Sequence, residues 1–107
     1  MSSISVLGIS REFAEHIIDY AEEVLGIVEK VKEGIRLLGS MNVGESMRQL
    51  GSAIREDTEA DAKRREILLA LTEVRGSYIR ERVARLVRRL DLVSEQTKEA
   101  ARDLTLI

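Results

Sequence analysis

The sequence predicts an all-α protein, an antiparallel up-down-up bundle of three helices, and three observations support this. The chain of 107 residues contains no proline, only 3% aromatic residues, and many aliphatic and charged residues that favour helices. Apolar residues recur every three or four positions through three long segments, which is the period of an α-helix. Only short turns separate these segments, and short turns make neighbouring helices antiparallel. The length indicates one domain, residues 1–107.

The first helix is expected over residues 10–39, because Ser10 can cap the free amides of the first turn and Gly39 can adopt the left-handed conformation that ends helices. Two neighbouring apolar rows run along it. The first row is Phe13, Ile17, Tyr20, Val24, Ile27, Val31 and Leu38, and the second is Ala14, Ile18, Ala21, Leu25, Val28 and Ile35. So wide an apolar face predicts more than one covering neighbour, and therefore a homodimer or higher homo-oligomer.

The second helix is expected over residues 45–74, after a turn at 41–44. Its apolar row is Met47, Leu50, Ile54, Leu68 and Leu71. The three- and four-residue spacing of this row continues through Asp57 and Asp61, at positions where an apolar residue would be expected. We therefore expect both side chains to face inward. A buried carboxylate is costly unless a cation, an arginine or water accompanies it.

The third helix is expected over residues 78–104, after a turn at 75–77. Its apolar row is Ile79, Val83, Leu86, Leu90, Val93, Thr97, Ala101 and Leu104. Asp91 lies beside this row, one residue away from Leu90.

Four acidic residues are placed symmetrically about Gly76. Asp61 and Asp57 precede it by 15 and 19 residues, and Asp91 and Glu95 follow it by 15 and 19 residues. If two helices fold back on each other near Gly76, these acids meet at the same heights, and the i,i+4 spacing keeps each pair on one helix face. Facing carboxylates either repel one another or hold a multivalent cation. The four residues are therefore a candidate metal site, with iron, zinc, manganese or magnesium as the metal.

The other interpretation is that arginines neutralise these acids. Arg64 and Arg65 lie three and four residues after Asp61, and Arg88 lies three residues before Asp91. These spacings permit ion pairs within a helix. Both interpretations remain open from the sequence.

Two stretches carry a resemblance to a known family. The segment IREDTEAD at 54–61, and LDLVSE at 90–95, resemble the PhoU-like family, in particular its short branch of phosphate-transport regulators. That family repeats a three-helix unit with an acidic E/D-x-x-x-D signature, and some members bind iron or zinc clusters there. Asp57-x-x-x-Asp61 fits the signature, and Asp91-x-x-x-Glu95 fits it with Glu in the last place. The matching region covers roughly residues 45–105.

The resemblance implies a non-enzymatic regulatory or accessory protein. It would be cytoplasmic, at most peripheral to the membrane, and a partner of a phosphate transporter or signalling protein. Full-length relatives carry two three-helix units and this chain has room for one, so it is either a fragment or pairs with a second copy into a six-helix assembly. The alternative is a structural helical oligomerisation module without metal.

Composition narrows the classes of function. The net charge of −2 favours no class of partner, and no apolar run is long enough for membrane insertion. The absence of cysteine excludes thiol catalysis and zinc–thiolate sites. The single histidine has no nucleophile motif around it and there is no Gly-rich phosphate loop, so we expect no enzyme. The arginines within 75–89 have one aromatic neighbour, Tyr78, and we interpret them as partners of glutamates rather than as a nucleic-acid site.

Overall fold

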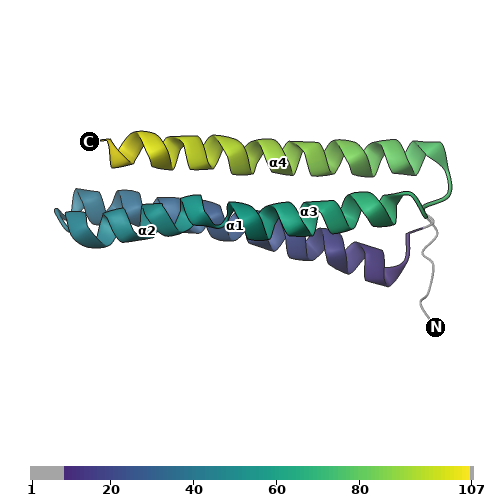
Figure 1. Cartoon of the computed structure of the whole chain (residues 1–107), viewed down its shortest axis with the longest axis horizontal. Coiled ribbons are helices and arrows are strands. Elements are labelled where there is room, and N and C mark those ends of the chain that lie inside the picture. The colour runs from purple at the N-terminus through teal and green to yellow at the C-terminus, as the bar shows by residue number, and fades with distance from the viewer. Residues whose placement is uncertain (1–8, 107) are drawn as a thin grey trace.

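The computed structural model describes residues 9–106, and its regular elements are all α-helices, which confirms the prediction of an all-α protein. Residues 1–8 and 107 of the predicted domain lie outside the described residues. The helices are α1 (Arg11–Gly39), α2 (Val43–Arg55), α3 (Asp57–Leu71) and α4 (Ser77–Thr105). Figure 1 shows that α2 and α3 follow each other along one line, while α1 and α4 both run in the opposite direction. The described part is elongated, measuring 51 × 23 × 19 Å.

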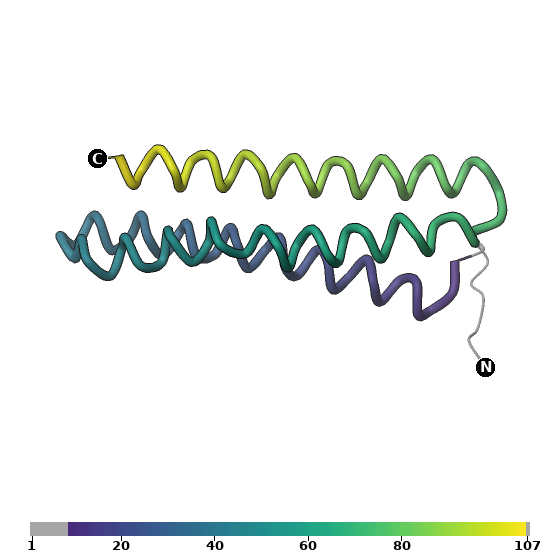
Figure 2. Tube along the Cα trace, viewed as in Figure 1, coloured from purple at the N-terminus to yellow at the C-terminus, as the bar shows by residue number. Residues whose placement is uncertain are grey.

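The prediction of one helix over 45–74 is wrong in two respects. The helix is interrupted at Glu56, where the backbone amide bonds to the Ala53 carbonyl, three residues back, at 3.3 Å. The interruption contains neither proline nor glycine, and the apolar period continues through it, which is why the sequence indicates no break. It puts Asp57 in the first turn of α3, where the free amides favour negative charge. In addition, α3 ends at Leu71 rather than at residue 74. Figure 2 follows the chain through both places.

The bounds of the first and last helices agree with the predictions to within one residue. As expected, the Ser10 side chain caps α1, since its hydroxyl oxygen accepts a hydrogen bond from the Phe13 amide at 3.1 Å. Gly39, by contrast, stays inside the helix, and the left-handed residue of the first turn is Met41, with φ 64°. At the second turn Gly76 has φ 91°, a conformation that favours glycine.

The core is aliphatic apart from Phe13 and Tyr20 and lies along the shared axis of the helices. Its buried members are Phe13, Tyr20, Val24, Ile27, Val31, Leu50, Ala53, Ala60, Ile67, Val74, Val83, Val87 and Ala101. The first apolar row of α1 thus faces the core, whereas Ile18, Leu25 and Ile35 of the second row are exposed. The other helices of the described chain leave these three side chains uncovered.

The apolar row predicted for the last helix is only partly buried. Val83 and Ala101 face the core, but Leu86 and Val93 are exposed. The buried face of α4 is turned so that it includes two polar residues, Ser94 and Lys98. This rotation brings Lys98 opposite the acids of α3. Leu68 of α3, also expected inside, is exposed.

Candidate functional site

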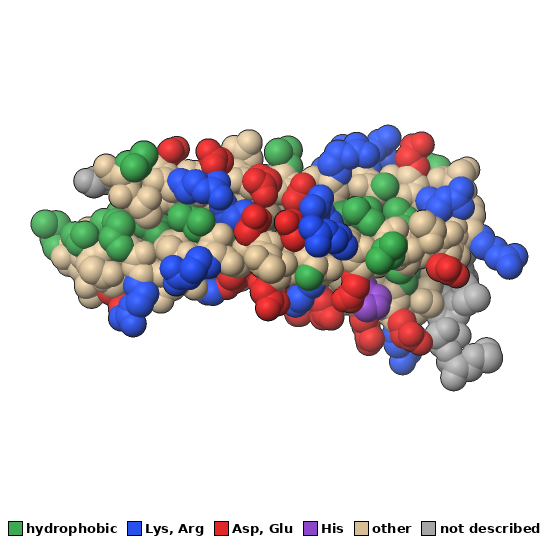
Figure 3. Space-filling view, viewed as in Figure 1, with side chains coloured by type: hydrophobic (Ala, Val, Ile, Leu, Met, Phe, Trp, Pro, Cys, Tyr) green, Lys and Arg blue, Asp and Glu red, His purple; other side chains and the backbone are tan. Residues whose placement is uncertain are grey.

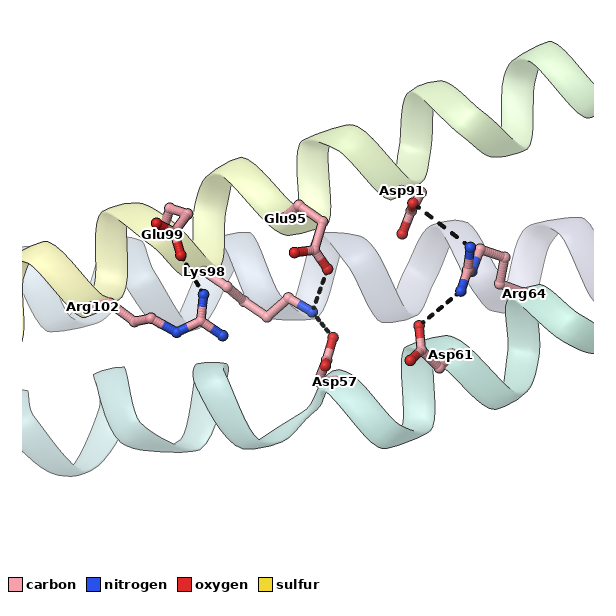
Figure 4. Close-up of polar contacts among 8 residues, drawn as sticks. All are labelled: Asp57, Asp61, Arg64, Asp91, Glu95, Lys98, Glu99 and Arg102. Carbon is pink, nitrogen blue, oxygen red and sulfur yellow. Dashed lines mark hydrogen bonds and ion pairs between the residues drawn. The ribbon is translucent and has the colours of Figure 1, made fainter.

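The four predicted acids lie between α3 and α4, in two pairs that each contain one acid from either helix. Lys98 of α4 makes ion pairs with Asp57, which is the closer, and with Glu95, at 3.3 Å between Nζ and Oε1. We call these three residues the Lys98 cluster. The mirrored spacing about Gly76 therefore correctly indicates that Asp57 faces Glu95. Figure 4 shows both carboxylates directed at the same ammonium group.

The second pair is arranged in the same way around an arginine. The Arg64 guanidinium reaches Asp61 on its own helix at 3.2 Å and Asp91 on α4 at 3.7 Å. Asp61, Arg64 and Asp91 form what we call the Arg64 cluster. Their side chains are all about one third exposed. Each cluster therefore has one basic group shared by two facing acids (Figure 4).

Lys98 is the most deeply buried charged group of the site. Its side chain is 1% exposed, whereas Asp57 and Glu95 are about half exposed. Burial by itself lowers the pKa of Lys98, but the hydrogen bonds to Asp57 and Glu95 outweigh it, so the pKa is raised above its usual value. The ammonium group is therefore charged at neutral pH, and its apolar stem packs inside the bundle.

Two polar atoms beside the clusters have no hydrogen-bond partner among the described residues. They are Nε of Arg64 and Oγ of Ser94, and both are buried. Tyr20 of α1 faces the same region and is 1% exposed. Burial first, and then the negative charge of Asp91, raise the pKa of the Tyr20 hydroxyl to about 12, and the positive charge of Arg64 partly opposes this shift. The charges of the two clusters, which lie on α3 and α4, thus also act on Tyr20 of α1.

Further ion pairs join α1 to the helices opposite. Lys30 contacts Glu56 at the interruption between α2 and α3 and donates to the Ser52 hydroxyl at 3.0 Å. Glu23 pairs with Lys63 at 3.2 Å, and the hydrogen bond between them raises the pKa of Lys63. In Figure 3, acidic and basic side chains gather around the middle of the molecule, with hydrophobic side chains on either side.

The residues as they lie do not suit a metal ion. Within residues 9–106, no group of three or more His, Cys, Asp or Glu side chains is placed to hold one. A metal between Asp57 and Glu95 would have to take the position of the Lys98 ammonium group, and one between Asp61 and Asp91 would have to displace Arg64. The predicted ligands are brought together in pairs, but each pair already has a cation.

Sequence reasoning identified the acids and one of their two partners. Arg64 was among the candidate partners, whereas Arg65 and Arg88 are exposed and pair with none of the four acids in the part described. Lys98 was missed. Its only signal in the sequence is a position three residues after Glu95, since its place on the buried face of α4 depends on how that helix is rotated.

None of the helices in the described part is long and apolar enough to cross a membrane. Comparisons with protein-family models, with curated proteins and with solved structures found no match.

Proposed function

We propose that this protein is a non-enzymatic helical module that acts by binding other protein chains, and that its four central acids hold α3 and α4 together. One observation carries the proposal: each facing pair of acids shares a basic side chain, Lys98 or Arg64. An ion pair that is partly removed from water is sensitive to the loss of one partner, because the remaining charge is left uncompensated. The acids have a structural role in this proposal.

The test is the double variant Asp57→Ala, Asp61→Ala, melted in the presence of a chelator. We expect it to be less stable than the wild type by about 1–3 kcal/mol, because Lys98 and Arg64 each lose one partner. This corresponds to a melting temperature lower by roughly 5–15 °C for a domain of this size. If the acids instead repel one another in the absence of metal, the melting temperature of the double variant would rise.

Two further variants sharpen this test. Lys98→Met keeps an apolar stem of similar length and removes the charge, so Asp57 and Glu95 would face each other without a cation, and we expect destabilisation in the same range. Glu59→Ala is the matched control, since Glu59 lies on α3 and is exposed. We expect Glu59→Ala to change the melting temperature by no more than a few degrees, because exposed charges contribute little.

A second candidate function is that of a PhoU-like regulator, a cytoplasmic partner of a phosphate transporter or its signalling apparatus. In its favour, the two acidic signatures stand level on facing helices, with Asp57 opposite Glu95 and Asp61 opposite Asp91. In this candidate the chain is one three-helix unit that pairs with a second copy into a six-helix assembly. In this candidate the acids bind metal only when it displaces Lys98 and Arg64, which stand between them.

Elemental analysis separates the two candidates. The untagged protein is purified without chelator beside the double variant Asp57→Ala, Asp61→Ala. Stoichiometric metal that is lost in the variant would support the PhoU-like candidate, and would show that metal displaces the two basic groups. No bound metal, even after reconstitution with iron, zinc, manganese and magnesium, would support the interaction module.

A further inference from the structure

Exposed apolar side chains lie along two of the helices. On α1, Ile18, Leu25 and Ile35 are each more than half exposed, and on α4, Leu86 and Val93 are more than 40% exposed. Ile18 and Leu25 are seven residues apart, as are Leu86 and Val93. A spacing of seven residues places side chains on the same side of a helix, as in a coiled coil.

Both rows border the groove between α1 and α4. On α1, Glu23 and Leu25 lie on either side of the buried Val24, since successive residues are about 100° apart. Glu23 pairs with Lys63 of α3, so Leu25 lies on the flank turned away from α3. On α4, Val93 and Glu95 flank the buried Ser94 in the same way.

Glu95 lies on the side of α4 that faces α3, because Lys98 joins it to Asp57 of that helix. Val93 therefore lies on the other side, next to α1, which packs against α4. The exposed rows of α1 and α4 thus form one continuous apolar face, which we call the α1–α4 face.

The two rows also stand at matching heights. Lys63 and Arg64 are neighbours on α3, and they contact Glu23 of α1 and Asp91 of α4 respectively. A residue of α1 is therefore level with the residue of α4 about 68 positions later (91 − 23). By this offset Ile18 is level with Leu86 (86 − 18 = 68), and Leu25 is level with Val93 (93 − 25 = 68).

Opposite charges border the two edges of this face. Exposed glutamates, Glu15 and Glu22, lie beside the row of α1, and Glu22 is within three or four residues of both Ile18 and Leu25. Exposed arginines, Arg82 and Arg89, lie beside the row of α4 with the same spacing of seven. Arg82 also stacks on Tyr78 of its own helix, with 5.3 Å between its guanidinium carbon and the ring centre.

We propose that the α1–α4 face binds a second copy of this chain, with a twofold axis parallel to the helices. Such an axis sets α1 of one copy against α4 of the other without a change in height. Glu15 then meets Arg82 of the partner subunit, and Glu22 meets Arg89 of the partner subunit, and both contacts occur twice by symmetry. Between these charged edges, Ile18 and Leu25 of each copy pack against Leu86 and Val93 of the other.

The charges select this arrangement over the other possible twofold arrangement. An axis perpendicular to the helices would set α1 against α1 and α4 against α4, so that glutamates face glutamates and arginines face arginines. Like charges opposite each other disfavour an interface. Because the chain itself supplies both the acidic and the basic edge, its own copy is the complementary partner. The inference rests on the proposed function as a binding module, and it names the surface and the partner.

The first test is the oligomeric state by sedimentation velocity across micromolar concentrations. We expect the wild type to be a dimer and Leu25→Lys to raise the dimer dissociation constant by about 100-fold or more, because each of two leucines leaves the interface. Leu69→Lys is the matched control, since Leu69 is an exposed leucine of α3, away from the α1–α4 face. A monomeric wild type at tens of micromolar, or a Leu69→Lys variant that dissociates while Leu25→Lys does not, would overturn the inference.

The second test is a charge exchange. Glu22→Arg and Arg89→Glu should each weaken the dimer by about tenfold, and the double variant should recover to within about threefold of the wild type, because each opposing pair is restored with reversed signs. A double variant weaker than both single variants would rule out this register. None of these substitutions touches the Lys98 or Arg64 cluster. The melting experiment on the acids therefore judges the proposed function separately, whatever the outcome here.

Discussion

At the scale of single residues, Lys98 is a charged residue whose side chain is buried in the interior of the bundle. It shares the inward face of α4 with Val83, Val87 and Ala101, and only its ammonium group reaches the half-exposed Asp57 and Glu95. Its pKa is raised in the folded protein. The two ion pairs therefore contribute to stability in full below about pH 10.5, and this contribution is lost as the pH rises through the folded-state pKa.

The titration of Tyr20 can be used to probe the same electrostatic environment. Its hydroxyl has a folded-state pKa of about 12 against 10.0 for free tyrosine, because burial and the nearby Asp91 disfavour the phenolate. In a Tyr78→Phe variant, where Tyr20 is the one tyrosine left, phenolate absorbance should appear with a midpoint near pH 12 in the folded protein. In denaturant the midpoint should return to about pH 10.

The same pKa shift determines how the stability of the folded protein changes with pH. The raised pKa of Tyr20 means that its contribution is present below pH 10 and is lost as the pH rises towards 12. Tyr20 above pH 10, and Lys98 above pH 10.5, therefore both predict that the stability of the folded protein falls as the pH rises. Identical phenolate midpoints with and without denaturant would contradict the placement of Tyr20 beside the acids.

At the scale of elements, the contact between α1 and α2 depends on a close approach at Gly34. A Cβ atom built on Gly34 would lie 2.6 Å from Cδ2 and 2.7 Å from Cγ of Leu50, a side chain that is fully buried. The Ser46 hydroxyl donates to the Gly34 carbonyl at 2.7 Å in the same place. The absence of a side chain at Gly34 thus lets α2 pack directly on the backbone of α1.

Two glycine substitutions on α1 should have opposite effects. Gly34→Ala should destabilise the fold by about 1–3 kcal/mol, because the added methyl group overfills a packed contact. Gly26→Ala should stabilise it by about 0.5–1 kcal/mol, because Gly26 is inside the same helix and nothing lies within 4 Å of the added Cβ. Thermal unfolding followed by circular dichroism measures both, and equal shifts in the two variants would contradict the close approach.

At the scale of the whole molecule, the described chain is long and thin. Its radius of gyration is 16.7 Å, whereas a compact domain of about 100 residues has roughly 13 Å. An elongated bundle leaves much apolar surface uncovered, as the exposed members of both rows show. Burying the α1–α4 face against a second copy would double the thickness of the bundle and cover that surface.

Self-association predicts that stability depends on protein concentration. If the dimer is the stable form, the melting temperature of the wild type should rise when the protein concentration is increased tenfold, since mass action favours the folded dimer. The Leu25→Lys variant should melt at a temperature that does not change with concentration. A wild-type melting temperature that is constant across that range would contradict a dimer that dissociates on unfolding.

Much of the local structure could be predicted because it depends on neighbouring residues in the chain. The fold class, the Ser10 cap, the glycine turn at Gly76 and the facing of Asp57 with Glu95 all follow from spacing and residue type. The interruption at Glu56 could not be predicted, since no helix breaker marks it. Lys98 was missed because its role requires knowing which side of α4 faces inward.

By itself, the sequence determined that this chain is helical, where its first and last helices begin and end, and which acids share a height on facing helices, because helix period and chain length decide these properties. Tertiary structure decided which of the two apolar rows of α1 is buried. It also decided that Lys98 and Arg64 form the ion pairs with the four acids. Both rows are apolar in the sequence and lie about 100° apart around the helix, and the positions of α2, α3 and α4 decide which of them faces the core. The choice of ionic partner likewise depends on helix rotation and on the reach of long basic side chains across the bundle.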